Sequence, residues 1–161
     1  YDESDFKWGG QPADDVQKIA LNKNKNLRWD KGVIISADTI VVDKNEIIGK
    51  PKNFEHAKEI LQRLSNRKHD VYSGLCVSYQ NMYKTTYSKT SVTLNKLSDS
   101  FIDQYIDKVG SLHKAGGCSI EGYGYLAFSS IQGCYYNVMG LPIHSLISLF
   151  KQMNIHFDHL Y

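Results

Sequence analysis

A run of almost uninterrupted apolar sequence, much of it β-branched, constrains the fold of this chain most strongly. It follows Gly32 and reads Val33-Ile34-Ile35-Ser36-Ala37-Asp38-Thr39-Ile40-Val41-Val42. Runs of this kind are typical of strands that are buried on both faces of a sheet. We therefore expect residues 33–42 to form an interior strand of a layered domain.

Helical and strand patterns alternate along the rest of the chain. Apolar residues at helical spacing predict helices over residues 12–25, 54–65, 99–109 and from 140 to about 153. Segments rich in Val, Tyr, Thr and Ser predict a long hairpin over residues 69–79 and 83–95, and we expect shorter strands over residues 47–48, 124–130 and 134–139. Because hairpins interrupt the alternation, we expect an α/β fold with a mixed, twisted sheet and flanking helices. The 161 residues fit a single domain, 1–161.

Composition excludes several classes of protein. The chain is 42% hydrophobic and 22% charged with a net charge of +2, as in ordinary globular proteins. No apolar run reaches the roughly 18 residues of a membrane span and no signal peptide is visible, so we expect a cytoplasmic protein without a membrane partner. Three cysteines without a Cys-x-x-Cys pair indicate neither a disulfide framework nor a zinc site. The 19 basic residues are scattered, which argues against nucleic acid as a partner.

One acidic residue, Asp38, interrupts the apolar strand. An ionised carboxylate in a dry strand is costly unless it is paired, binds a metal or lines a cleft. Acids in such surroundings cluster at functional sites. Two interpretations therefore stay open from the strand alone: a functional acid, or an aspartate at a strand end that caps a turn.

Two further segments carry residues suited to binding an anion. Lys50 lies between Gly49 and Pro51, and a lysine at such a stiff corner suits a phosphate clamp better than a flexible surface lysine does. A glycine-rich stretch over residues 115–124 would let backbone amides approach a ligand closely. Glu121 lies between the glycines of this stretch. Its side chain has two possible roles: it contacts the edge of a ligand, or it is an ordinary acid on the surface.

Other chemistry finds no support. The six histidines show no metal-ligand spacing, and we assign none of them a catalytic role. Ser36 and Ser73 have no evident base partner, so nucleophilic catalysis is not indicated.

Taken together, these segments resemble the Maf family of nucleotide pyrophosphatases, from about Tyr1 to about Phe150. The motifs that carry the resemblance stand in the family order. They are residues 36–42 and 49–52, residues 61–74, Leu97-Ser98-Asp99, His113-Lys114-Ala115-Gly116-Gly117, Glu121-Gly122, and Asn137-Val138-Met139-Gly140-Leu141-Pro142.

The resemblance implies both a fold and an activity. The fold is a two-lobed α/β structure similar to inosine-triphosphate pyrophosphatases. Proteins with this fold often form dimers, so a homodimer is one possible assembly of this chain. The activity is hydrolysis of a nucleoside triphosphate between its α and β phosphates, which yields a monophosphate and pyrophosphate with the help of Mg²⁺ or Mn²⁺.

The resemblance also places the family's site residues. The family acid falls on Asp38, its glutamate on Glu3, its helix lysine on Lys23 and its Gly-Lys-Pro lysine on Lys50. Carboxylates such as Glu3 and Asp38 suit a cation that bridges phosphates. Asp38 is equally suited to orient or deprotonate the attacking water. Lys23 and Lys50 would offset charge on the phosphates as pyrophosphate leaves.

The chain departs from the family pattern in two respects. The family begins with Ser-x-Ser-Pro-Arg-Arg, which would precede Tyr1, and we expect the full-length protein to contain it.

The second departure concerns the base of the nucleotide. Family members that act on dTTP and UTP resemble this chain at Thr39 but carry Gln in place of Glu121. Members that act on 7-methyl-GTP carry Glu there and usually Gln at the Thr39 position. Since Gln both donates and accepts hydrogen bonds whereas ionised Glu only accepts, the base stays open.

An alternative function follows from the arginine motif that the chain does not show. On this hypothesis the protein is a non-catalytic regulator of cell division that binds nucleotides or nucleic acid, in keeping with the family's link to septum formation.

Overall fold

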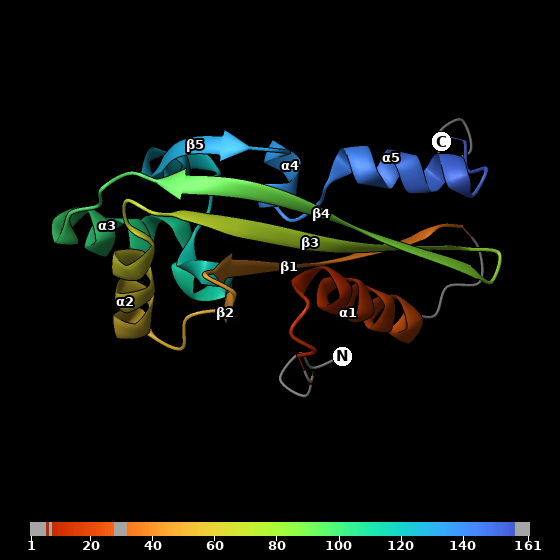
Figure 1. Cartoon of the computed structure of the whole chain (residues 1–161), viewed down its shortest axis with the longest axis horizontal. Helices are drawn as coiled ribbons and strands as arrows, with labels where there is room; N and C mark the ends of the chain where they lie inside the picture. Colours follow the sequence, from red (N-terminus) through yellow and green to blue (C-terminus); the bar gives the residue numbers. More distant parts are fainter. Residues whose placement is uncertain (1–5, 7, 28–31, 157–161) are drawn as a thin grey trace.

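The structure, a computed structural model, describes Phe6, residues 8–27 and residues 32–156. Its centre is a five-stranded sheet with the strand order β2-β1-β3-β4-β5 (Figure 1). The strands are β1 (Ile34–Asp43), β2 (Glu46–Ile48), β3 (Lys68–Tyr79), β4 (Met82–Leu94) and β5 (Phe128–Gln132). Neighbouring strands pair in antiparallel fashion throughout this sheet. The predicted α/β fold with a sheet and flanking helices is confirmed, but within the described residues the sheet is antiparallel and not mixed, because its strands are joined as hairpins or by connections that return the chain in the opposite direction.

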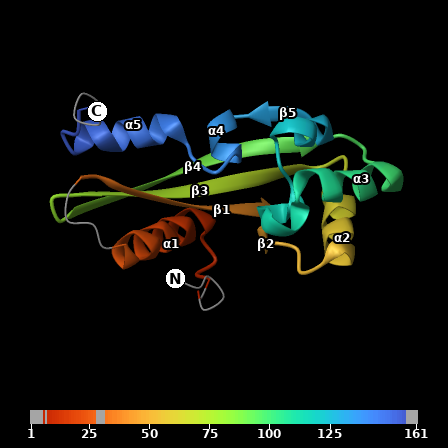
Figure 2. The ribbon, with the colours of Figure 1, turned by 180° about the vertical axis from the view of Figure 1, so that it is seen from behind.

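The helices occupy both faces and one end of the sheet (Figures 1 and 2). They are α1 (Pro12–Asn26), α2 (Phe54–Leu64), α3 (Asp99–Val109), α4 (Tyr135–Val138) and α5 (Ile143–Gln152). Three 3₁₀ turns, η2 (Ser111–His113), η3 (Ala115–Gly117) and η4 (Gly122–Ala127), connect α3 to β5. No helix in the described ranges is long and apolar enough to cross a bilayer.

Helix α1 packs very closely against β1 and β3. Its contact residues Val16, Ile19 and Ala20 are at most 1% exposed. Gly74 of β3 lies beneath the helix, and a Cβ atom at that position would overlap the Val16 carbonyl group. Because Gly74 is also the partner of Asp38 in the β1–β3 register, this close approach brings α1 next to Asp38.

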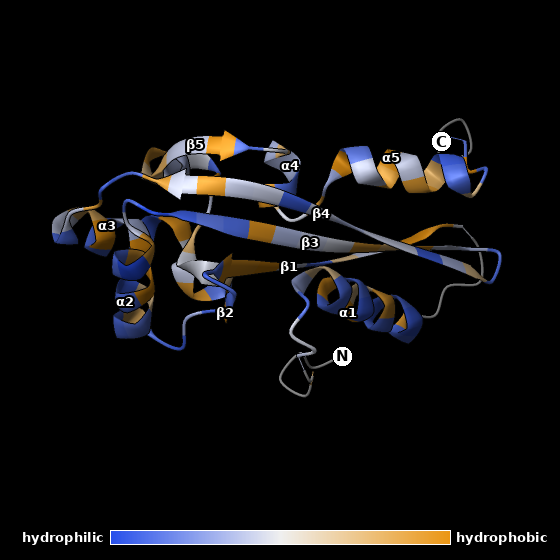
Figure 3. Ribbon diagram, in the orientation of Figure 1, coloured by the Kyte–Doolittle hydropathy of each residue, from blue (hydrophilic) through white to orange (hydrophobic). Residues whose placement is uncertain are grey.

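The opposite face of the same strands carries α5. Leu75 and Val77 of β3 form a buried cluster there with Leu149 and Phe150. Since successive strand residues point to opposite faces, Gly74 and Leu75 mark the two sides of the sheet. Figure 3 shows that β1, which lies between these layers, is hydrophobic at both of its ends.

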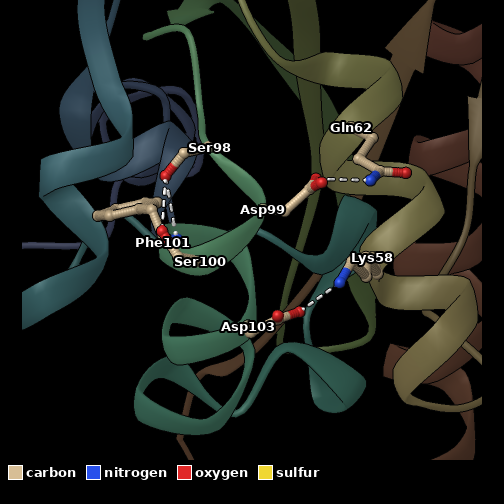
Figure 4. Close-up of polar contacts among 7 residues, drawn as sticks. All are labelled: Lys58, Gln62, Ser98, Asp99, Ser100, Phe101 and Asp103. Atoms are coloured by element: carbon tan, nitrogen blue, oxygen red, sulfur yellow. Dashed lines mark hydrogen bonds and ion pairs between the residues drawn. The ribbon is translucent and has the colours of Figure 1, made fainter.

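Helices α2 and α3 close one end of the molecule. Their apolar sides join the largest buried cluster, and two polar pairs cross between them (Figure 4). Lys58 Nζ lies 2.7 Å from Asp103 Oδ1, and Gln62 Nε2 donates to Asp99 Oδ1 over 2.8 Å. The Ser98 hydroxyl caps α3 by accepting a first-turn backbone N–H, as its sequence position predicts.

The strand predicted over residues 134–139 is wrong, because Tyr135–Val138 form the short helix α4. The cause is tertiary. Asn137 turns inward and donates from Nδ2 to the Val71 carbonyl oxygen and to Thr90 Oγ1, over 3.1 and 2.9 Å. The strand predicted from residue 124 begins only at Phe128, since Gly124 is drawn into the preceding 3₁₀ turn.

Candidate active site

A cavity of about 280 Å³ lies beside β1, where α1, β3 and the glycine-rich loop converge. Four of the residues predicted from the sequence line it together: Lys23, Asp38, Thr39 and Lys50. They come from α1, from β1 and from the corner after β2. The fold therefore gathers in one place side chains that are scattered along the sequence.

Asp38 lies within β1 rather than at its end, which excludes the turn-capping interpretation. The residue is 8% exposed, and Lys23 Nζ donates a hydrogen bond of 2.6 Å to its Oδ1 atom. A charge-assisted bond of this length is among the stronger polar contacts in proteins. It compensates the carboxylate for its burial in an apolar strand.

The Gly49-Lys50-Pro51 corner is held by the glycine-rich loop. The Gly116 N–H donates to the Gly49 carbonyl oxygen over 3.1 Å. Gly116 has a φ of +63°, and a Cβ atom there would lie 2.9 Å from Val41 Cγ2. Glycine thus permits both the backbone turn and the close contact, and this contact fixes the corner from which Lys50 reaches the cavity.

Thr39 belongs to a chain of hydrogen bonds that supports another part of the cavity wall. Its Oγ1 atom lies 2.7 Å from Ser73 Oγ, and the Ser73 hydroxyl donates to the Asn137 carbonyl oxygen over 3.0 Å. Asn137 is fully buried, and the residues that follow it, 138–140, line the cavity. Gly140 has a φ of +104°, and a Cβ atom there would lie 3.4 Å from Thr39 Oγ1.

The remainder of the lining is largely apolar and includes one buried histidine. The apolar contributors include Val41, Val71, Val92, Phe128 and Val138. His69 lies among them and is 4% exposed. Burial lowers the pKa of its imidazole, and the charges of Asp43 and Asp70 and a hydrogen bond with the Arg67 backbone offset this only in part. His69 is therefore neutral at pH 7. Reasoning from the sequence assigned it no role, although it falls within a motif that resembles the family.

Comparison with known proteins identifies the family of the chain. The sequence model of the family described as Maf-like protein matches residues 1–153. The chain belongs to the Maf family. It is 39% identical over 161 residues to the dTTP/UTP pyrophosphatase of Clostridium tetani, a match that covers 96% of this chain and 84% of the relative. It is 40% identical over 150 residues to a dTTP/UTP pyrophosphatase of Bacillus cereus, with 92% of this chain and 78% of the relative covered.

The Maf resemblance also singles out Glu121 and Glu3. Glu121 is exposed at the start of η4 and does not line the cavity, although its carboxylate lies 3.9 Å from Lys114 Nζ, and Lys114 does line it. Glu3 lies outside the described residues. The roles assigned to Glu121 and Glu3 stay predictions.

A divalent cation fits the donor chemistry of this Maf site. Within the described residues, no group of three or more His, Cys, Asp or Glu side chains forms a metal cage. Mg²⁺ commonly binds through one or two carboxylates together with substrate phosphates. Asp38 offers such a carboxylate at the cavity, so the site suits an ion shared with a bound triphosphate.

Proposed function

We propose that this chain is a nucleoside triphosphate pyrophosphatase, which hydrolyses the bond between the α and β phosphates and releases a monophosphate and pyrophosphate. The observation that carries the proposal is the convergence of Lys23, Asp38, Thr39 and Lys50 on one cavity. One acid and two lysines suit the attack of water on a highly anionic substrate. The names of the Clostridium and Bacillus relatives support the same reaction.

In this proposal Asp38 serves the attacking water. Its carboxylate stands at the cavity and is oriented by the Lys23 hydrogen bond, so it is placed to accept a proton from water. Mg²⁺ or Mn²⁺, held by Asp38 and Glu3, would neutralise charge on the phosphates when it is bound.

The two lysines act on the phosphates. Lys23 arrives from the last turn of α1, and Lys50 from the corner fixed by the Gly116–Gly49 hydrogen bond. Ammonium groups in fixed positions stabilise negative charge as it grows on the departing pyrophosphate.

For the base we propose dTTP and UTP rather than 7-methyl-GTP. Thr39 lines the cavity and matches the dTTP/UTP type, whereas Glu121, which matches the other type, stands outside the lining. Both relatives carry the dTTP/UTP name.

The test is turnover by purified full-length protein with Mg²⁺ or Mn²⁺. The panel contains dTTP, UTP, CTP, 7-methyl-GTP and ITP, and ion-exchange chromatography identifies the products. We expect monophosphate and pyrophosphate, formed fastest from dTTP and UTP. Release of a diphosphate and orthophosphate, or no turnover of any nucleotide, would overturn the proposal. Binding without turnover would favour the non-catalytic regulator.

A further inference from the structure

His69 stands out among the buried polar groups of the molecule. Within the described residues, five buried side-chain atoms have no hydrogen-bond partner: Asp15 Oδ1, Asn24 Oδ1, His69 Nδ1, Ser111 Oγ and Asn137 Oδ1. Of these five residues, His69 is the one that lines the cavity. Because buried polar groups in folded proteins nearly always have partners, a buried histidine that lines a cavity and has incomplete hydrogen bonding points to a ligand.

The surroundings of His69 suit a flat, uncharged ring. Its cross-strand partner is Val92, and Val71 follows it on the same face of β3; both line the cavity. Thr39 of β1 pairs with Ser73 of β3. Ser73 and His69 are four residues apart on β3, a distance of about 13 Å along the strand at the usual rise per residue. Asp38 and His69 line the same cavity, so a nucleotide bound with its phosphates near Asp38 can extend its base toward His69.

The charge state of His69 favours a base over a phosphate. Burial lowers the pKa of the imidazole, so the ring is neutral at pH 7. A neutral imidazole has one donor nitrogen and one acceptor nitrogen, which matches the N–H and C=O groups of thymine and uracil. A phosphate subsite would call for a cation instead, and the lysines provide that elsewhere in the cavity.

We propose that His69 hydrogen-bonds the polar edge of the nucleobase through its imidazole ring and thereby determines specificity for the base. This inference deepens the proposed function and rests on it for the class of ligand. It makes His69 a specificity-determining residue with no part in the chemical step.

Equilibrium binding separates this role from a structural one. The probes are α,β-imido-dTTP, its counterpart with 2,4-difluorotoluene in place of thymine, and inorganic tripolyphosphate, each with Mg²⁺. Difluorotoluene keeps the shape of thymine but lacks its strong hydrogen-bonding groups. The variants are His69→Leu, which removes the nitrogen, and His69→Asn, whose amide falls near the position of Nδ1. His144→Asn, at an exposed histidine on α5 outside the cavity lining, is the matched control.

We expect wild-type protein and the His144→Asn variant to bind the thymine probe about tenfold more tightly than the difluorotoluene probe. His69→Leu should abolish this ratio, His69→Asn should retain part of it, and tripolyphosphate should bind all four proteins alike. An unchanged ratio in His69→Leu overturns the inference. So does a parallel loss of all three probes in both His69 variants, because a structural residue would act in that way.

Turnover of dTTP by the wild-type protein is measured alongside. Turnover with an unchanged ratio leaves the proposed function standing and removes the role of His69. A base-dependent ratio that His69→Leu abolishes, in a protein that does not hydrolyse dTTP, supports the role of His69 and removes the enzymatic proposal.

Discussion

Lys23 Nζ donates a 2.6 Å hydrogen bond to Asp38 Oδ1, and this contact joins the last turn of α1 to the interior of β1. The two residues are 15 positions apart in the chain. Their meeting depends on the close seating of α1 above Gly74, which is the cross-strand partner of Asp38. The geometry of the candidate site is therefore coupled to the packing of one helix.

Gly74→Ala should disturb stability and turnover together. The added methyl group would overlap the Val16 backbone, so α1 must move away from the sheet and Lys23 must move with it. We expect a loss of about 1–3 kcal/mol in the free energy of unfolding, measured in urea, and a lower kcat. Gly49→Ala is the control, because a Cβ atom there meets nothing within 4 Å. Unchanged stability in Gly74→Ala would contradict the packing described for α1.

Lys50→Ala should lower kcat/KM for dTTP by about 100-fold, since it removes one fixed positive charge from the phosphates. Its stability should change little, because the side chain is exposed. Lys52→Ala provides a matched comparison: Lys52 is also exposed and stands two residues away, but it does not line the cavity. Steady-state kinetics of both variants check the prediction, and equal losses in the two would count against a specific role for Lys50.

Asn137→Ala should weaken the part of the cavity wall to which Thr39 and Val71 belong. The amide group holds the Val71 carbonyl oxygen and Thr90 Oγ1, and its loss leaves these buried acceptors without that donor. We expect destabilisation by about 2 kcal/mol and a raised KM for dTTP. Asn95→Ala, which removes comparable hydrogen bonds from an exposed side chain, should have a smaller effect on both. Thermal unfolding and initial-rate measurements provide the comparison.

His69 should make the stability of the protein depend on pH. Burial lowers the pKa of the folded imidazole, whereas the unfolded imidazole takes up a proton below about pH 6.5. The unfolded state therefore binds more protons as the pH falls, and the free energy of unfolding decreases, by at most about 1.4 kcal/mol per pH unit for this group. In His69→Leu this contribution should vanish. Urea unfolding at several pH values between 7 and 5 measures the difference in slope, and parallel slopes would show that the folded imidazole titrates normally.

Local patterns in the sequence were enough to predict most elements of the fold. The β-branched run became β1, and the apolar spacing of residues 54–65 became α2 with Asn53 as its cap. Helix α4 escaped prediction because its cause is not local. Its residues Tyr135-Tyr136-Asn137-Val138 favour a strand, and the inward hydrogen bonds of Asn137 to β3 and β4 turn them into a helix.

The residues of the candidate site also differ in how far the sequence alone could identify them. Asp38 could be singled out by itself, because a charge inside an apolar strand is unusual. Lys23 required the family resemblance, since nothing local distinguishes it from other helix lysines. His69 lies within a motif that resembles the family, but the sequence alone did not assign it a role. Its burial and its incomplete hydrogen bonding are set by the packing of β3 against distant segments.

Asp38→Asn is the most direct test of the central claim. Pyrophosphate release from dTTP with Mg²⁺ is measured for wild-type protein, for Asp38→Asn and for Asp70→Asn. Asp70 is also ion-paired within the sheet, 2.9 Å from Lys89, but lies outside the cavity lining. The account predicts a fall in kcat of about 10²–10⁴-fold for Asp38→Asn with its fold retained, and near-wild-type kcat for Asp70→Asn. A folded Asp38→Asn variant that releases pyrophosphate at the wild-type rate would contradict it.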